Sequence, residues 1–181
     1  MSAAGEASKC MRKLKAIWFP VLCVLLAVLT ACGAPAGEPV QDRPLTCTVS
    51  ISCASLLDNM ERLDENKKAL VPENGVVLPE TQAAFAEGES VYDVLQRVCQ
   101  ENKLHMEAEF TPVYDSYYIQ GIGNLYEFDA GSLSGWMYAV NGWFPNYGCS
   151  QYELKDGDAV TWVYTCDLGA DVGGDMAAAG E

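Results

Sequence analysis

Residues 135–144 read Gly-Trp-Met-Tyr-Ala-Val-Asn-Gly-Trp-Phe and form the densest aromatic block of the chain. An Asn-Gly pair flanked by β-forming residues is a strong hairpin signal, because both central residues of a type I′ turn need a positive φ. Before that turn, strand alternation places Trp136 and Tyr138 on one face and Met137 on the other. Both faces are largely apolar, so this strand is either central and covered on both sides, or keeps one face for a ligand.

The N-terminus has the pattern of an export signal. Lysine or arginine at positions 9, 12, 13 and 15 precedes an apolar run of 14 residues, Ala16–Leu29. The run is short for a membrane span and suits the h-region of a signal peptide. It ends in Leu29-Thr30-Ala31-Cys32, which resembles a bacterial lipobox. The resemblance predicts a signal peptide at residues 1–31 and a lipidated Cys32 as the mature first residue. The alternatives are a plain signal peptide cut nearby and an uncleaved anchor.

The next segment, residues 32–45, is expected to be a flexible tether that follows the lipidated Cys32. It holds three prolines and two glycines and few large apolar residues. A lipid anchor followed by a tether keeps a domain at the extracytoplasmic face of the cell membrane without embedding it. The residues from 46 to 173 are the expected folded domain, and the small, glycine-rich tail at 174–181 is expected to be disordered.

The charge of the exported part limits its partners. Beyond residue 32 the chain has 7 basic and 24 acidic residues, a formal net charge of −17. Such a charge opposes binding to nucleic acid or to anionic lipid. It suits a soluble, monomeric domain whose acidic residues solvate the surface, and no acidic run has the spacing of a calcium loop.

Five cysteines remain after the lipidation site. Cys47 and Cys53 face the same side of one expected strand but lie roughly 20 Å apart when extended, so they cannot pair with each other. Cys149 and Cys166 flank a Gly-Asp turn symmetrically and are the candidate disulfide in an exported protein. Cys99 on a helix is the expected free thiol. With no Cys-x-x-Cys pair and a single histidine, a metal site is not expected.

Hydrophobic periodicity predicts a strand-rich chain with one main helix. Strict alternation over Thr46–Cys53 predicts a first strand, and Ala159–Tyr164 predicts a last one. A capping box at Ser90 begins the helix Val91–Asn102, whose apolar residues recur at helical spacing. Further strands are expected at Val76–Leu78, where Pro79 ends the strand, at Thr81–Ala86 and at His105–Phe110, and a short helix is expected within Ser55–Leu70. This order predicts an α+β fold, a small β-grasp-like domain with a mixed sheet curled over one main helix.

The motifs of the second half resemble a known family. They are Asn124–Asp129, Gly135–Gly142, Asn146–Cys149, Leu154–Asp158 and Trp162–Gly169. Together they resemble the C-terminal domain of transcobalamin and intrinsic factor, and more closely a bacterial lipoprotein family of unknown function related to that domain. The resemblance spans residues 46–173 and implies a β-grasp-like fold. One departure is Ala130, where relatives usually carry a cysteine; its loss leaves a partner cysteine unpaired and puts the Cys149–Cys166 pair in doubt.

The resemblance implies a surface-tethered, ligand-binding domain with cobalamin or a related corrinoid as the candidate ligand. In the vertebrate carriers the domain caps cobalamin held against a helical domain, which is absent here, so this chain offers half a site. A corrin is a broad, partly apolar disc edged with amides, which aromatic and backbone groups could cover. The candidate ligand-binding residues are Trp136, Tyr138, Asn141, Gly142, Trp143, Phe144, Tyr117 and Tyr118. For Trp136 and Tyr138 a core role is favoured, because aromatics that alternate on a strand usually pack inside.

Two other classes of function were weighed. A protein-interaction or structural module could bind a membrane or cell-surface protein through an edge strand or the aromatic loop. An enzyme is not expected, because the chain has no nucleophile motif, no Ser/His/Asp order and no metal cluster, and no cofactor is required. His105 is expected to be structural.

Overall fold

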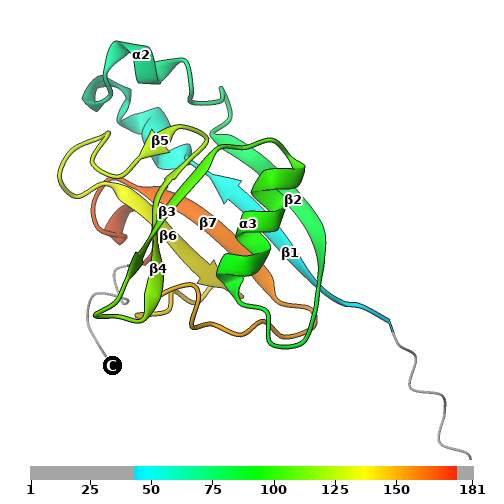
Figure 1. Cartoon of the computed structure of the whole chain (residues 1–181). Helices are drawn as coiled ribbons and strands as arrows, with labels where there is room; N and C mark the ends of the chain where they lie inside the picture. The colour runs from blue at the N-terminus through cyan, green and yellow to red at the C-terminus, as the bar shows by residue number, and fades with distance from the viewer. Residues whose placement is uncertain (1–42, 175–181) are drawn as a thin grey trace, which may run out of the picture. The chain divides into compact units, whose positions relative to one another are not determined.

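The computed structural model describes residues 43–174, which fold as a small α+β domain with two sheets (Figure 1). The α+β class and the mixed sheet are confirmed. The larger sheet has four strands in the order β2 (Val76–Phe85), β1 (Leu45–Ser52), β7 (Ala159–Thr165) and β6 (Gly135–Val140). β1 pairs antiparallel with β2 and parallel with β7, and β7 pairs antiparallel with β6. A crossover of more than 100 residues therefore joins the two central strands.

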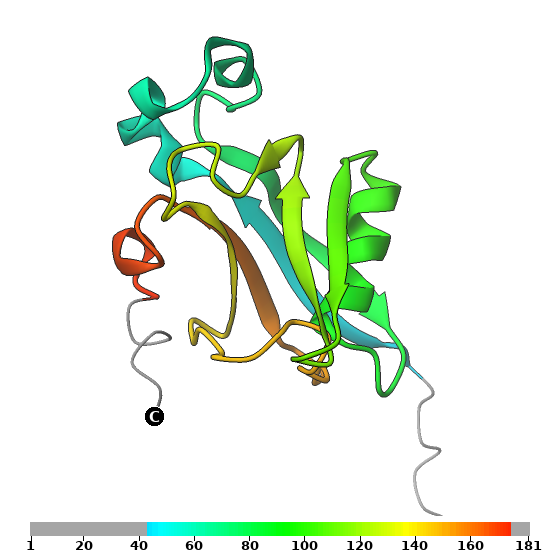
Figure 2. The ribbon, with the colours of Figure 1, turned by 60° about the vertical axis from the view of Figure 1, so that its left-hand side comes forward.

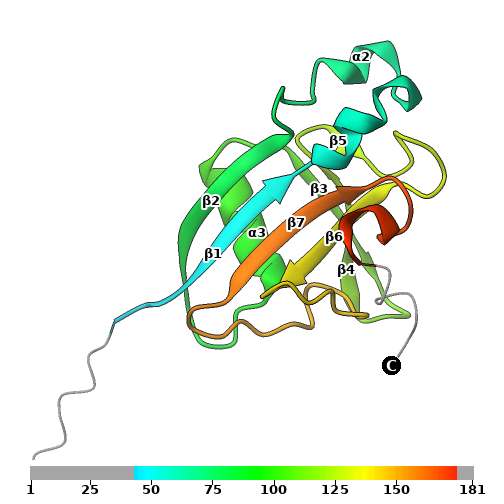
Figure 3. The same cartoon turned by 180° about the vertical axis from the view of Figure 1, so that it is seen from behind.

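One face of this sheet carries the core (Figures 1 and 2). The helix α3 (Val91–Glu101) crosses that face beside β1 and β2, and buries the apolar stripe that the sequence predicted. The second sheet, β3 (Met106–Thr111), β4 (Ser116–Ile122) and β5 (Leu125–Tyr126), covers the same face beside β6 and β7. Figure 3 shows the opposite face of the four-stranded sheet from behind.

The alternation of the central strands β1 and β7 produces this two-sided sheet. In β1 the buried positions are those predicted from the sequence, with Cys47, Val49 and Ile51 in the core. In β7 the side chains of Trp162 and Tyr164 are almost fully buried on the same face. The helix begins at the predicted capping box, because the Ser90 and Asp93 side chains bond to each other's backbone N–H groups.

Within the described residues, four short helical elements lie outside the sheets and α3. Between β1 and β2 lie η1 (Ala54–Asp58), η2 (Met60–Arg62) and α2 (Glu65–Lys68), in place of the single short helix expected there. Leu56 and Leu63 anchor these turns in the core. A last turn, η3 (Ala170–Val172), follows β7.

Three local predictions need correction. Pro79 does not end a strand: β2 runs through it, because β2 lies at the edge of the sheet, where a missing N–H costs no ladder bond. Of the two alternatives left open for the aromatic strand, a central position is excluded, because β6 lies at the other edge of the sheet. The Asn-Gly turn has the expected positive φ at Asn141 and Gly142. The chain after the turn forms only one bridge back to β6, between Val140 and Trp143, so no second hairpin strand follows directly. The antiparallel partner of β6 is β7.

The cysteines also differ from the prediction. All five cysteines of the described part are free and buried, so the structure does not contain the Cys149–Cys166 pair. The Cys149 thiol donates to the Tyr117 carbonyl on β4, whereas the Cys166 thiol lies against the Ser55 hydroxyl that follows β1. The signal peptide, Cys32, most of the tether and residues 175–181 lie outside the described residues. Among the described helices, none has the length and apolarity that crossing a membrane requires.

Candidate functional site

A groove runs between β4 and β6 and is bordered along its length by the loop that contains Pro145. Three depressions of about 420, 180 and 360 Å³ line up along it. All three share Tyr118 on β4 and Pro145 on the loop, so they form one continuous surface, here called the aromatic groove. The loop approaches β4 so closely that a Cβ at Gly148 would lie 1.7 Å from Ser116 Oγ, and only glycine fits there.

The central depression is lined by the buried face of β6 and β7. Trp136, Tyr138 and Trp162 form its wall together with Cys149. Burial raises the pKa of the Tyr138 hydroxyl above its ordinary value, and raises the pKa of the Cys149 thiol to about 12. Both groups are therefore neutral at pH 7, and the wall is of low polarity.

The outer ends of the groove expose apolar side chains to water. Tyr114 and Tyr147 line the depression near the β3–β4 turn, and Phe128, Leu133 and Leu168 line the one at the other end. Phe128 and Leu168 are each 61% exposed and lie at positive φ, 67° and 47°. A left-handed backbone at a bulky residue costs about 1–2 kcal/mol, so these side chains are held outward at an energetic cost.

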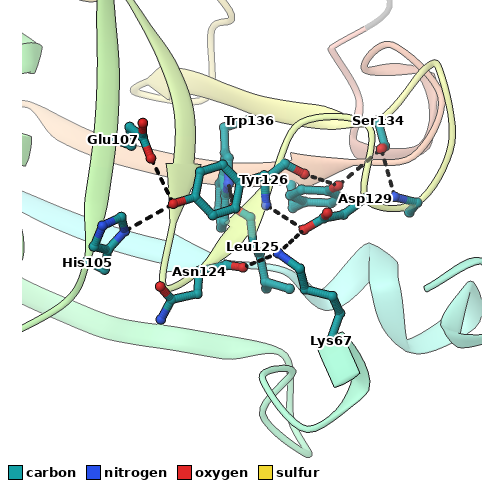
Figure 4. A network of polar contacts seen from close by, with 11 residues as sticks. Lys67, His105, Glu107, Asn124, Leu125, Tyr126, Asp129, Ser134 and Trp136 are labelled. Carbon is teal, nitrogen blue, oxygen red and sulfur yellow. Dashed lines mark hydrogen bonds and ion pairs between the residues drawn. The ribbon is translucent and has the colours of Figure 1, made fainter. Parts of the chain in front are cut away.

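A polar network beneath the groove fixes the loop that carries Phe128 (Figure 4). Lys67 from α2 donates to the Asn124 carbonyl at 2.8 Å, pairs with Asp129 at 3.0 Å and lies over the ring of Tyr126. Asp129 also accepts from the Tyr126 backbone N–H at 2.7 Å. The predicted Asn124–Asp129 motif is thus a structural clamp at this end of the groove.

Buried hydroxyl and indole groups complete the clamp. The Tyr164 hydroxyl donates to the Tyr126 carbonyl at 2.7 Å and lies 3.1 Å from Ser134 Oγ. The Trp136 indole donates to the Leu125 carbonyl at 2.8 Å (Figure 4). These bonds hold β6, β7 and the 124–134 loop together at this end of the groove.

Two neighbouring tyrosines of β4 line the groove and make different contacts. Tyr117 stacks on Tyr92 of α3 with ring centroids 4.1 Å apart, which fixes β4 against the helix. Tyr118 lies in the groove, and its hydroxyl donates to Glu127 at 2.7 Å. Burial, and then this bond to a carboxylate, raises the pKa of Tyr118 well above its ordinary value.

The structure brings together four of the eight predicted ligand-binding residues. Tyr117, Tyr118, Trp136 and Tyr138 line the groove, and the last two are also core residues, as favoured from the sequence. The others, Asn141, Gly142, Trp143 and Phe144, line none of its three depressions. Asn141 instead bonds to buried Asp158 and to the Ala159 N–H, and Trp143 packs edge-on against Tyr147.

Several groove residues were not predicted. They are Tyr114, Phe128, Leu133, Pro145, Tyr147, Trp162 and Leu168. A usable signal existed for some of them, because large apolar residues inside turn-forming sequence, such as Phe128 before Asp129, seldom have a core to enter. No group of three His, Cys, Asp or Glu side chains within residues 43–174 could hold a metal ion.

A family model and solved structures are similar to parts of this chain. Residues 88–166 match the family model of a domain of unknown function (DUF4430), a span that begins just before α3 and ends just after β7. No curated protein matches the sequence. The fold is similar to haptocorrin in a crystal structure in complex with Cbi, with a TM-score of 0.49 and 13% identity. That match covers 76% of this chain and 29% of haptocorrin.

A second solved structure also matches. It is a candidate metal-binding protein from Ruminococcus gnavus ATCC 29149, with a TM-score of 0.39 and 16% identity. That match covers 67% of this chain and 96% of the other.

Proposed function

We propose that residues 43–174 form a non-catalytic domain that binds a small molecule in the aromatic groove. The observation that carries this proposal is the exposure of Tyr114, Phe128, Leu133, Tyr147 and Leu168 around one continuous depression. Contiguous exposed apolar surface with a few polar groups is typical of ligand sites. Two of these side chains, Phe128 and Leu168, also lie at positions with a strained, left-handed backbone.

The candidate ligand is cobalamin or a related corrinoid. The support is the resemblance of the second-half motifs to the transcobalamin family, together with a groove whose rings could cover a flat apolar disc. On this proposal Cys32 carries lipid, and the tether keeps the domain at the extracytoplasmic face of the cell membrane. The groove has one wall on each sheet and is open outward, so it would cover only part of a corrin and bind it weakly without a partner.

A binding role is favoured over catalysis by the state of the thiols. Burial raises the pKa of Cys47, Cys53 and Cys99 to about 11, and that of Cys149 to about 12. A thiol needs to ionise before it acts as a nucleophile, so at pH 7 these groups are inert.

The test is a fluorescence titration of the full chain in mild detergent with cyanocobalamin and dicyanocobinamide, corrected for corrinoid absorbance. Saturable quenching of tryptophan emission is expected. Phe128→Ala and Tyr118→Ala should each weaken binding about tenfold, as expected for the loss of about 1.4 kcal/mol of ring contact. Leu57→Ala on η1 is the control, because Leu57 is 41% exposed and lines none of the three depressions of the groove. Absence of saturation at 1 mM of both corrinoids would reject them as ligands.

A second candidate function is a protein-interaction module. The β3–β4 hairpin exposes Phe110, Val113 and Tyr114, and β3 is an edge strand of its sheet. Such an edge can accept a partner strand. A photo-crosslinking residue in place of Val113 tests this function in cells. One specific crosslinked protein would support it. If the same crosslink forms when corrinoid is added, the hairpin binds its partner independently of the groove.

A further inference from the structure

One hydrogen-bond donor in the wall of the groove has no partner. Trp162 is 2% exposed and lines the central depression, and its Nε1–H makes no hydrogen bond within the described residues. A buried donor without a partner loses its hydration and gains no bond in return, which destabilises the fold. Native structures seldom keep such a donor, so its presence needs an explanation.

Other donors around this depression already have acceptors. Trp136 donates to Leu125, Tyr138 donates its hydroxyl proton to the Tyr147 carbonyl at 3.0 Å, and Tyr118 donates to Glu127. The Trp162 indole is therefore the buried N–H or O–H donor of this wall that is left without an acceptor. It lies opposite Tyr138 in the β6–β7 register, and the two rings are 5.5 Å apart.

The open edge of β6 supplies acceptors and further donors beside it. Val140 exchanges both of its backbone bonds with Trp143, so its N–H and C=O point away from β7. Backbone direction alternates along an antiparallel strand, so Trp136 and Tyr138 present their N–H and C=O to the same edge. No strand pairs with that edge, because β6 ends the sheet order, and both residues line the central depression.

The charge of this region excludes an anion. None of the residues that line the central depression is a lysine or an arginine. Glu127 lies against Tyr118, and the charge of Asp93 adds to the burial that keeps the Cys149 thiol neutral. A carboxylate would lose its hydration there without gaining a cation, which is costly.

We infer that the central depression is an amide-selective subsite, in which the Trp162 indole donates to a carboxamide oxygen of the ligand. The amide N–H₂ of that group donates in turn to a free carbonyl on the β6 edge. Because Nε1 is out of reach of bulk water in the unliganded groove, a small shift of the neighbouring rings accompanies this contact. The inference rests on the proposed function, since it names the chemical class that the groove selects: a neutral, amide-bearing ligand rather than its acid.

The test follows the indole N–H signals of the ¹⁵N-labelled full chain in detergent, assigned with single Trp→Phe variants. Acetamide and acetate, titrated separately to high concentration, are the two small probes, and dicyanocobinamide is the third. Acetamide should move the Trp162 signal downfield, as expected for a new hydrogen bond, and acetate should not. The Trp136 signal is the internal control, because its N–H already has an acceptor.

The outcomes separate the two proposals. A Trp162 shift with acetamide but none with dicyanocobinamide supports the subsite and rejects the corrinoid. Equal shifts with acetamide and acetate, or a Trp162 signal that stays fixed with all three probes, overturn the inference. Trp162→Phe should weaken dicyanocobinamide binding about tenfold. Trp136→Phe is the control, because it removes a hydrogen bond internal to the protein and so measures the loss of binding that comes from the fold alone.

Discussion

The strained position of Phe128 gives the sharpest test of the groove. Its φ of 67° lies in the left-handed region, and its side chain is 61% exposed. At an ordinary position alanine is more stable than glycine, because glycine loses more backbone entropy on folding. At a left-handed position the order should reverse, because alanine keeps the steric strain and glycine does not. Phe128→Gly is therefore expected to be more stable than Phe128→Ala.

The size of this reversal follows from two opposing effects. Left-handed strain costs alanine about 1–2 kcal/mol, and backbone entropy costs glycine about 0.5–1 kcal/mol. Glycine should therefore lead alanine at position 128 by about 1 kcal/mol. Phe110 in β3 is similarly exposed at 44% and has no positive φ, so there glycine should trail alanine by about 0.5–1 kcal/mol. Comparison of glycine with alanine at each site removes the lost ring contacts, which are common to both variants.

Urea unfolding followed by circular dichroism measures both differences. With a slope of about 2 kcal/mol per molar urea, the midpoint of Phe128→Gly should exceed that of Phe128→Ala by about 0.5 M. At position 110 the midpoint of Phe110→Gly should lie below that of Phe110→Ala by about 0.3 M. If glycine is less stable than alanine at both positions, the loop does not hold Phe128 in the left-handed conformation, and the argument for a strained rim fails. Both Phe128 variants should still lose corrinoid binding equally, since neither retains the ring.

Three further predictions concern the frame around the groove. Lys67→Met removes the partly buried ion pair with Asp129 and should lower the free energy of unfolding by about 1–2 kcal/mol. The loss should be smaller in 1 M salt, and urea titrations at two salt concentrations measure this difference. Burial raises the thiol pKa values from 9.0 to about 11 or 12, so between these values the folded state keeps protons that the unfolded state loses. The contribution of the thiols to stability should therefore be constant below pH 9 and fall as pH rises toward 11. Unfolding midpoints measured across this range should fall less steeply in Cys99→Ala, which has one thiol fewer. Ala130→Cys should form a disulfide with Cys166, since positions 130 and 166 line one depression. Thiol titration of the unfolded variant should find two thiols fewer after oxidation than before it, with no such loss in Ala130→Ser. An equal number of thiols before and after oxidation would contradict the prediction.

The sequence predicted those elements whose pattern is decided locally. The strand β1, the helix α3 and the strand β7 each have a periodicity that only one burial pattern can satisfy. The place of β6 in the sheet could not be predicted this way. Whether a two-sided apolar strand is central or at an edge depends on what covers it, and here the cover comes from β4 and the Pro145 loop.

The candidate site was predictable only in part for a similar reason. Tyr118, Trp136 and Tyr138 stand out as aromatics, but the groove exists because two loops distant in sequence meet at its rim. The Leu168 N–H donates to the Leu133 carbonyl at 2.9 Å, and this bond sets the position of both apolar side chains. The missing partner of Trp162 is not visible in sequence at all, because every strand tryptophan carries the same N–H.

The groove itself favours a small molecule over an added strand. A partner strand on β6 would need about 4.8 Å of free space beside the edge, and pairing over several residues. The free part of that edge is short, because Val140 is already paired with Trp143 and the Phe128 loop lies at the other end. β4 packs beside β6 and shares the wall of the central depression. A single amide needs one acceptor and one donor, which this narrow edge and the Trp162 indole supply. A strand would leave most of its own groups unpaired. A protein partner is therefore better placed at the exposed edge of β3, and the groove at the β6 edge is suited to a ligand that carries its amides on a compact, apolar body.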